Sequence, residues 1–314
     1  MMIRPRLTVA LIALLAACSE STGPSGSNIT GPQFTISVRY VDRAPPSPAV
    51  VGAFNKAAAK WQTVIVDSVG SVPIKLAAAA CDSSQPALNE TVKDLLILVH
   101  VRPITDSVPG QAILGESGPC LVRNPGNLPI VGVMSLNGST LTSLSNSGLL
   151  DDVIEHEMAH LLGFGTVWDL DNLLRDSTTN NPWFSGADAQ AAFRQALPTY
   201  TDKVVPVEAG GGAGTTLSHW RESVMTNELM TGFINSPGPN PLSAITIESM
   251  ADLGYTVDVS AAELWPTPGS GMTAVVEGRA APASVVVAAP PHTVLHGPRF
   301  AVTRSGGIVP LSSR

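Results

Sequence analysis

Residues 156–160 read His-Glu-Met-Ala-His, and this H-E-x-x-H motif constrains the chain more than any other feature. Positions four apart lie on one face of a helix, so the imidazoles of His156 and His160 can bind one zinc ion. Glu157 then projects beside the ion, where its carboxylate can hold and deprotonate a water molecule. The chain has only 6 histidines, so a chance match on an ordinary amphipathic helix is improbable. The motif predicts a zinc-binding helix.

A catalytic zinc site of this kind needs a third protein ligand and leaves a fourth position open. The common extension of the motif would place a histidine at position 166, but Thr166 stands there, while Gly163 keeps the turn after the helix. Of the four other histidines, one lies in an apolar, strand-like run and two lie among prolines. His219 follows the glycine-rich segment 208–216, which can return the chain to the metal. His219 is therefore the favoured third ligand.

Four blocks of sequence then suggest a family. They read HEMAHLLGFG at 156–165, SHWRE at 218–222, NELMT at 227–231 and TIESMADLGY at 246–255. Their order and spacing resemble the leishmanolysin branch of the metzincin zinc peptidases, in which an inserted region precedes the third histidine. The resemblance covers about residues 34–266. It implies the zinc ligands His156, His160 and His219, the general base Glu157, and Met230 as the methionine of the turn beneath the zinc.

The periodicity of the chain favours an α+β fold, and the resemblance makes it a metzincin-like zincin. Strand patterns occur at 34–41, 72–78, 94–101, 111–116 and 129–136, and a helix can begin at Ser47 and Pro48. We expect an N-terminal catalytic subdomain over residues 33–165, with a mixed sheet, covering helices and the zinc helix. The resemblance implies that an edge strand lines the cleft and pairs with extended substrate, and by position this is 111–116.

A smaller, loop-rich C-terminal subdomain is expected over residues 166–266, with the third histidine and the methionine turn. Its last predicted helix spans 242–253, with Ser243 as a cap and Gly254 at its end. Residues 267–314 are rich in proline, glycine and alanine, and either a small β appendage or a disordered tail fits them. No role can be assigned to this tail.

The first seventeen residues resemble an export signal, with two arginines before a short apolar stretch. The stretch ends in Leu-Ala-Ala-Cys, which resembles a bacterial lipobox with Cys18 as the lipidated residue; an ordinary secretory signal is the alternative. Residues 18–32 are rich in serine, glycine and proline, as in a flexible tether. We expect an exported cell-envelope lipoprotein that is attached to a membrane through its N-terminal lipid.

Cysteine usage and charge agree with export. With Cys18 lipidated, Cys81 and Cys120 remain as a pair, and a disulfide is the simplest prediction in an oxidising compartment. The formal net charge is −7 and aromatic content is 5%, so a nucleic-acid partner is not expected. No later run is long enough for a transmembrane helix.

Together these features predict a secreted or surface-anchored zinc endopeptidase that acts on protein or peptide substrates. Zinc would activate water and Glu157 would serve as general base. One alternative is a hydrolase with an acidic third ligand, Glu208 or Glu228. A second alternative is a non-catalytic, zinc-containing envelope binding module, although binding alone gives no reason to retain Glu157.

Overall fold

The computed structural model describes residues 33–104, 114–212, 214–234, 239–267, 293–295 and 297–311. The predicted signal (1–17), Cys18 and the tether lie outside the described residues. Within the described part of the chain, no helix is long and apolar enough to cross a membrane.

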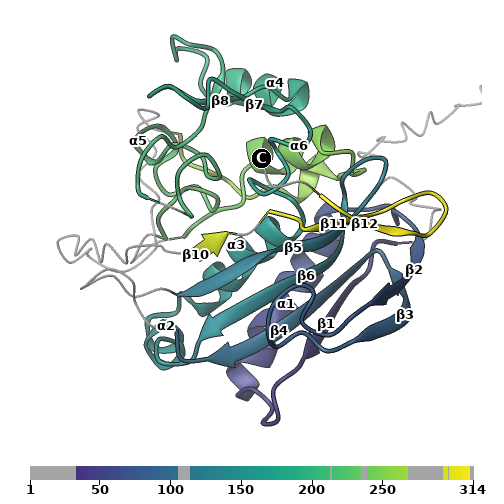
Figure 1. Cartoon of the computed structure of the whole chain (residues 1–314). Coiled ribbons are helices and arrows are strands. Elements are labelled where there is room, and N and C mark those ends of the chain that lie inside the picture. Colours follow the sequence, from purple (N-terminus) through teal and green to yellow (C-terminus); the bar gives the residue numbers. More distant parts are fainter. Residues whose placement is uncertain are drawn as a thin grey trace, which may run out of the picture. The chain divides into compact units, whose positions relative to one another are not determined.

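A mixed β-sheet forms the centre of the fold, as predicted (Figure 1). Its strands, in spatial order, are β1 (Ile36–Tyr40), β4 (Leu95–Arg102), β6 (Pro129–Asn137), β5 (Gly115–Arg123), β11 (Phe300–Val302) and β12 (Ile308–Pro310). A further strand, β10 (Thr293–Leu295), also pairs with β5. Strands β1, β4 and β6 are mutually parallel, whereas β5 is antiparallel to β6.

The two faces of this sheet are covered differently, and β4 shows why. Its alternate residues Leu95, Ile97 and Val99 pack in the cluster that includes helices α1 (Pro48–Val64) and α3 (Leu150–Leu161). Leu96 and Leu98 point to the other face and pack in a second cluster. That second face is covered by a hairpin of β2 (Ser71–Leu76) and β3 (Leu88–Lys93). A continuous apolar strand is therefore buried on both sides.

Helix α1 begins as its sequence predicts. The Ser47 hydroxyl accepts a hydrogen bond from the amide of Val50, and Pro48 occupies the first turn, where no amide hydrogen is needed. The indole Nε1 of Trp61 donates to the carbonyl oxygen of Glu155 on α3 at 3.0 Å. This bond joins α1 and α3, the two helices that pack on the same face of the sheet.

The chain after α3 is composed of short elements. They are the strands β7 (Leu174–Arg175), β8 (Trp183–Phe184) and β9 (Val205–Pro206), the helices α4 (Ala187–Ala196), α5 (Glu222–Met225) and α6 (Ala244–Asp252), and the 3₁₀ turn η1 (Val259–Ala261). Asp252 at the end of α6 accepts hydrogen bonds from the first-turn amides of Asp188 and Ala189, so α6 supplies the N-terminal cap of α4. The Ser243 cap of α6 forms as predicted.

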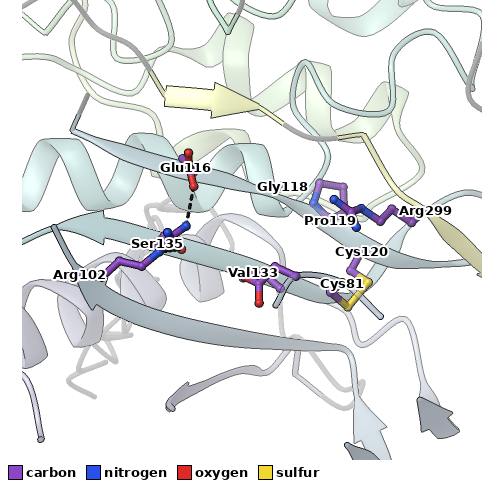
Figure 2. A pocket seen from close by; sticks show the side chains of 10 residues that line it. Cys81, Arg102, Glu116, Gly118, Pro119, Cys120, Val133, Ser135 and Arg299 are labelled. Atoms are coloured by element: carbon purple, nitrogen blue, oxygen red, sulfur yellow. Dashed lines mark hydrogen bonds and ion pairs between the residues drawn. A yellow bond between two sulfur atoms is a disulfide. The ribbon is translucent and has the colours of Figure 1, made fainter. Parts of the chain in front are cut away.

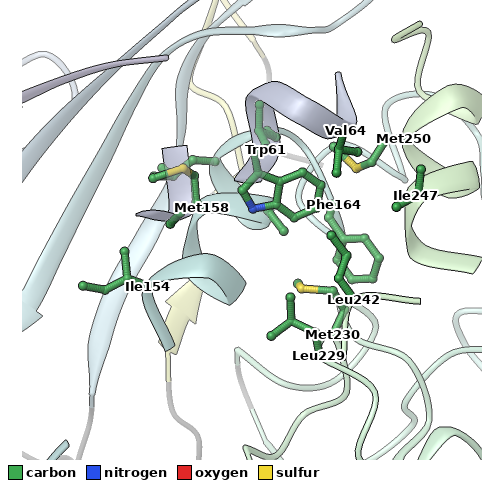
Figure 3. Close-up of a cluster of buried hydrophobic side chains, with 14 of the residues drawn as sticks. Trp61, Val64, Ile154, Met158, Phe164, Leu229, Met230, Leu242, Ile247 and Met250 are labelled. Carbon is green, nitrogen blue, oxygen red and sulfur yellow. The ribbon is translucent and has the colours of Figure 1, made fainter. Parts of the chain in front are cut away.

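An apolar cluster joins this later region to the helices under the sheet (Figure 3). Figure 3 shows Trp61 and Val64 of α1 and Met158 of α3 near residues from the later segments. Those residues include Phe164, Leu229, Met230, Leu242, Ile247 and Met250, all of them buried. The segments on both sides of the zinc motif therefore share one core.

One predicted strand needs correction. Residues 111–113 lie outside the described part, and the observed strand begins at Gly115 and runs on to Arg123. Gly118 and Pro119 lie within the strand, and a register shift between Pro119 and Leu121 accommodates the proline. The strand is also not a free edge, because β10 and β11 from the C-terminal tail pair with it.

Two elements of the chain before α3 were not predicted. Strand β3 buries only Leu88 and Val92, with polar residues between them, so its pattern is weak. Helix α2 (Leu141–Ser147) buries only Leu144 and ends at Gly148 in the left-handed conformation. Both lie on the surface of the fold, where the hydrophobic pattern carries the least information.

Cys81 and Cys120 form a disulfide that joins the loop after β2 to strand β5 (Figure 2). Beside it, Arg102 of β4 forms an ion pair with Glu116 of β5 at 2.7 Å. His100 belongs to β4, and its ring lies between Asp42 and Ser84, at 3.1 Å and 2.8 Å. His100 therefore makes its side-chain contacts at the sheet, away from the H-E-x-x-H motif.

Candidate metal centre

Helix α3 carries His156 and His160 on one face, and both side chains are buried. The helix ends at Leu161, and the chain turns sharply through Gly163, whose φ is 114°. At this angle a side chain is strained, and a Cβ would also lie 3.0 Å from Val167 and 3.3 Å from Leu253. The glycine of the motif therefore has a backbone role and a packing role.

The structure brings His219 to the same place. The Nε2 atoms of His156, His160 and His219 form a triangle with sides of 3.0, 3.0 and 3.1 Å. A tetrahedral zinc site with N–Zn bonds of about 2.0–2.1 Å has ligand–ligand edges of roughly 3.3 Å. Among the described residues, these three form the one group of histidine, cysteine or acidic side chains compact enough to hold a metal ion.

The other nitrogen of each ring fixes its tautomer. The Nδ1 of His156 lies 2.7 Å from the carbonyl oxygen of Leu229, and that of His160 lies 2.8 Å from the carbonyl oxygen of Phe164. The Nδ1 of His219 faces the carbonyl oxygen of Thr215 at 3.1 Å. Carbonyl oxygens only accept hydrogen bonds, so each Nδ1 must carry the hydrogen, and a neutral ring then has a bare Nε2.

Burial favours the neutral form of two of these rings, His160 and His219. It lowers the pKa of His160 well below the ordinary value, and the neighbouring His219 and His156 lower it further. Burial, followed by the charge of His156, likewise lowers the pKa of His219. With each Nδ1 bonded to a carbonyl oxygen, the three Nε2 atoms converge on one point. A cation that accepts imidazole nitrogen at tetrahedral spacing satisfies this arrangement, and zinc fits it.

A second glycine lets His219 reach the other two histidines. Gly165 has a φ of 72°, and a Cβ on it would lie 2.2 Å from the carbonyl oxygen of Ser218. No side chain fits there, so the backbone just before His219 lies directly against the turn after α3. Gly165 was not predicted as a residue of the site. The glycine that follows Phe164 was its only signal.

The segment after His219 is fixed by its backbone and by an aromatic cluster. The amide of Glu208 donates to the carbonyl oxygen of His219, and the amide of Trp220 donates to that of Met230. The indole of Trp220 lies 4.9 Å from Phe164 and 5.0 Å from Trp168, measured between ring centroids. The backbone bond from Glu208 and the packing of Trp220 together fix the position of His219.

Glu157 lies next to the histidines and is buried. The hydroxyl of Ser117 on β5 donates to its Oε2 at 2.7 Å. A narrow pocket adjoins it, lined by Leu114, Val153, His156, Glu157, His219, Gly232, Phe233 and Ile234. Glu157 therefore lines the same pocket as His156 and His219, together with apolar side chains.

Glu228 is the most buried acid near the site, and it is fully paired. One carboxylate oxygen accepts from the amide of Met230 at 2.6 Å. The other accepts from the amide and hydroxyl of Ser243 and from the hydroxyl of Thr246, at 3.1, 2.7 and 2.5 Å. Burial still raises the pKa of Glu228. This residue joins the 227–231 turn to the N-terminus of α6, where negative charge is favoured.

Both acids considered as third ligands are used elsewhere. Glu208 accepts from the amides of Ala209, Gly210 and Glu222, and Glu228 accepts the four bonds described above. The hydroxyl of Tyr255, at the end of the 246–255 block, donates to the carbonyl oxygen of Leu162 in the core. Among the described residues, His219 and neither acid therefore joins His156 and His160 in a group that could hold a metal ion.

Comparison with known proteins identifies the family. The family model described as leishmanolysin, peptidase M8, matches residues 83–275, more than half of the chain. Leishmanolysin from Leishmania donovani is 31% identical over 169 residues, which make up 51% of this chain and 28% of that protein. Leishmanolysin from Leishmania major is 30% identical over 170 residues, or 51% of this chain and 27% of that protein.

The leishmanolysin homolog of Crithidia fasciculata is 27% identical over 157 residues, or 48% of this chain and 23% of that protein. The similarity therefore spans only about a quarter of the length of these relatives. The matched region of this chain contains both halves of the motif, from the zinc helix to His219 and the 227–231 turn. The match across more than half of its length shows that the chain belongs to the leishmanolysin family.

Proposed function

We propose that this chain is a zinc-dependent endopeptidase that hydrolyses peptide bonds in protein or peptide substrates. The observation that carries the proposal is the triangle of His156, His160 and His219 Nε2 atoms, with the carboxylate of Glu157 facing the same pocket. Three imidazoles complete a tetrahedral site except for one position, which is the arrangement of catalytic rather than structural zinc.

His156, His160 and His219 would hold the zinc ion, which would supply a Lewis acid to polarise the scissile carbonyl and would lower the pKa of a water molecule to about 7. Glu157 accepts the proton of the attacking water and returns it to the leaving amine. The hydroxyl of Ser117 fixes one oxygen of this carboxylate, so Glu157 is held in one orientation before substrate arrives.

The turn at residues 227–231 fits the metzincin methionine turn. Met230 is fully buried in the shared core, and the preceding carbonyl orients His156. We assign it a packing role, because a methionine fills an irregular space without adding a polar group. On this basis the catalytic unit divides into residues 33–165, with the sheet and zinc helix, and 166–266, with His219 and Met230.

We also propose that the protein is exported and attached to a membrane through lipid on Cys18. The sequence Leu-Ala-Ala-Cys at 15–18 supports this, together with the serine- and glycine-rich segment that follows. Cys18→Ala should leave the protein unlipidated, and detergent partitioning should then be lost. Intact mass showing a mature N-terminus at another residue would contradict lipidation.

The proposed activity is tested by zinc content together with cleavage of an unstructured protein such as denatured casein. We expect about one zinc per chain, new peptide termini within the substrate, and loss of both after treatment with a chelator. Zinc at full occupancy with no cleavage would instead support a non-catalytic binding module.

A further inference from the structure

Strand β5 runs beside the candidate base. Ser117 on this strand donates to Glu157, and Leu114, just before the strand, lines the pocket shared with His156 and His219. On one side β5 pairs with β6 from Gly115 to Val122. The amide and carbonyl groups on its other side form a surface to which an extended peptide can add as a new strand.

The C-terminal segment of the chain already uses this surface. Thr293, Val294 and Leu295 of β10 pair in parallel with Gly115, Glu116 and Ser117. Farther along, β11 pairs in parallel with residues 121–123, and the amide of Arg299 donates to the carbonyl oxygen of Cys120. The segment thus follows β5 from the residues beside Glu157 to the far end of the strand (Figure 1).

The two ends of this segment are held differently. In β11, Ala301 and Val302 are buried, and the carbonyl oxygen of Val302 accepts from the amide of Asn124. Strand β12 then pairs with β11 in a hairpin. Strand β10 has three residues and, among the described strands, pairs with β5 alone. Strands β11 and β12 therefore anchor the segment, while β10, beside the site, is held by its three-residue pairing with β5.

We infer that residues 293–295 act as an internal strand on the β5 surface that an extended substrate would use, so this segment of the chain competes with substrate. The inference rests on the proposed function. A peptide lying across the histidines and pairing with residues 115–117 needs the backbone groups that β10 engages. Because β11 keeps β10 close to β5, a substrate must displace β10 from β5 before it can pair there. The strength of this competition depends on the effective concentration of β10 at the β5 surface.

The test is a full-length double variant, Thr293→Pro with Val294→Pro. Successive residues of a strand turn their amides to opposite sides, so two adjacent prolines remove whichever amide pairs with β5. We expect KM for an extended peptide to fall about three- to tenfold with kcat unchanged, because a short tethered competitor acts at millimolar effective concentration. The matched control, Thr293→Ala with Val294→Ala, keeps both backbone amides and should leave KM unchanged.

A second measurement does not depend on catalysis. The affinity of a fluorescent extended peptide for the zinc-free protein, measured by anisotropy, should rise in the proline variant and stay constant in the alanine variant. Equal peptide affinity in the wild type and the proline variant would overturn the inference, even if both hydrolyse peptides. If no form of the protein cleaves peptides, the proposed activity fails, and the anisotropy result still decides whether β10 covers the peptide surface.

Discussion

The Nδ1 of His156 lies 2.7 Å from the carbonyl oxygen of Leu229, the residue before Met230. This contact joins the zinc helix to a turn more than seventy residues later in the chain, and Glu228 fixes that turn through the amide of Met230. The orientation of one histidine therefore depends on a buried carboxylate that touches no histidine. Such supporting contacts commonly change metal affinity 10- to 100-fold when they are removed.

Glu228→Gln should weaken zinc binding by about tenfold or more. The two carboxylate oxygens accept from the backbone amides of Met230 and Ser243, respectively. A glutamine has one oxygen and one NH₂ group, so one of these amides must face another donor. Competition with a chromophoric chelator measures the zinc affinity.

Ser243→Ala is the matched control for that variant. It removes the helix cap and one hydroxyl from the same carboxylate but keeps the Met230 bond, so it should cost about 1 kcal/mol of stability with little change in zinc affinity. Equal zinc affinities for Glu228→Gln and the wild type would show that Glu228 supports only the fold.

Gly165→Ala should displace His219 and weaken zinc binding. The new Cβ would lie 2.2 Å from the carbonyl oxygen of Ser218, so the backbone before His219 must move away from α3. Gly148→Ala is the control, because Gly148 has a similar φ of 76° but open space around its Cβ position. Each should cost about 1 kcal/mol from backbone strain, but Gly165→Ala alone should lose metal. Full zinc occupancy in Gly165→Ala would contradict this role.

Glu155→Gln should stabilise the protein at pH 8 but not at pH 4.5. Burial, followed by the charge of Glu263, raises the pKa of Glu155 to about 7, and its Oε1 has no hydrogen-bond partner among the described residues. The unfolded chain releases this proton near pH 4.5, so the folded state loses stability as pH rises from about 4.5 to 7. The loss is constant above that window and amounts to at most about 3 kcal/mol.

Thermal unfolding of the wild type and Glu155→Gln at both pH values measures this effect. Equal differences in Tm at pH 4.5 and pH 8 would show that Glu155 is ionised in the folded protein throughout that range.

The sequence was most informative where chemistry and periodicity coincide. The motif at 156–160 placed two histidines on one helix face, and the apolar run at 94–101 predicted a central buried strand. The placement of His219 beside them depended on a process of elimination, because residues 162–218 separate it from the end of the helix at Leu161 and no local pattern links the two.

Other features depend on tertiary packing that no local pattern records. Gly165 is required by a backbone contact with Ser218, which is distant in sequence. The pairing of residues 293–295 with β5 is equally non-local, and a proline-rich tail gives little strand signal. Sequence alone could not exclude Glu228 as a zinc ligand, because a glutamate that binds zinc and a buried glutamate that caps a helix and orders a turn look the same in the sequence. The structure gives Glu228 the second role.

The division of labour between Glu157 and the histidines is the centre of this account, and zinc content measured alongside peptide hydrolysis in Glu157→Ala tests it most directly. If Glu157 is the general base, the variant should retain about one zinc per chain while its rate falls by roughly 10²–10⁴. The companion variant His219→Ala should lose zinc, because two imidazoles leave the ion incompletely coordinated. Loss of zinc from Glu157→Ala, or full hydrolysis by it, would contradict the account.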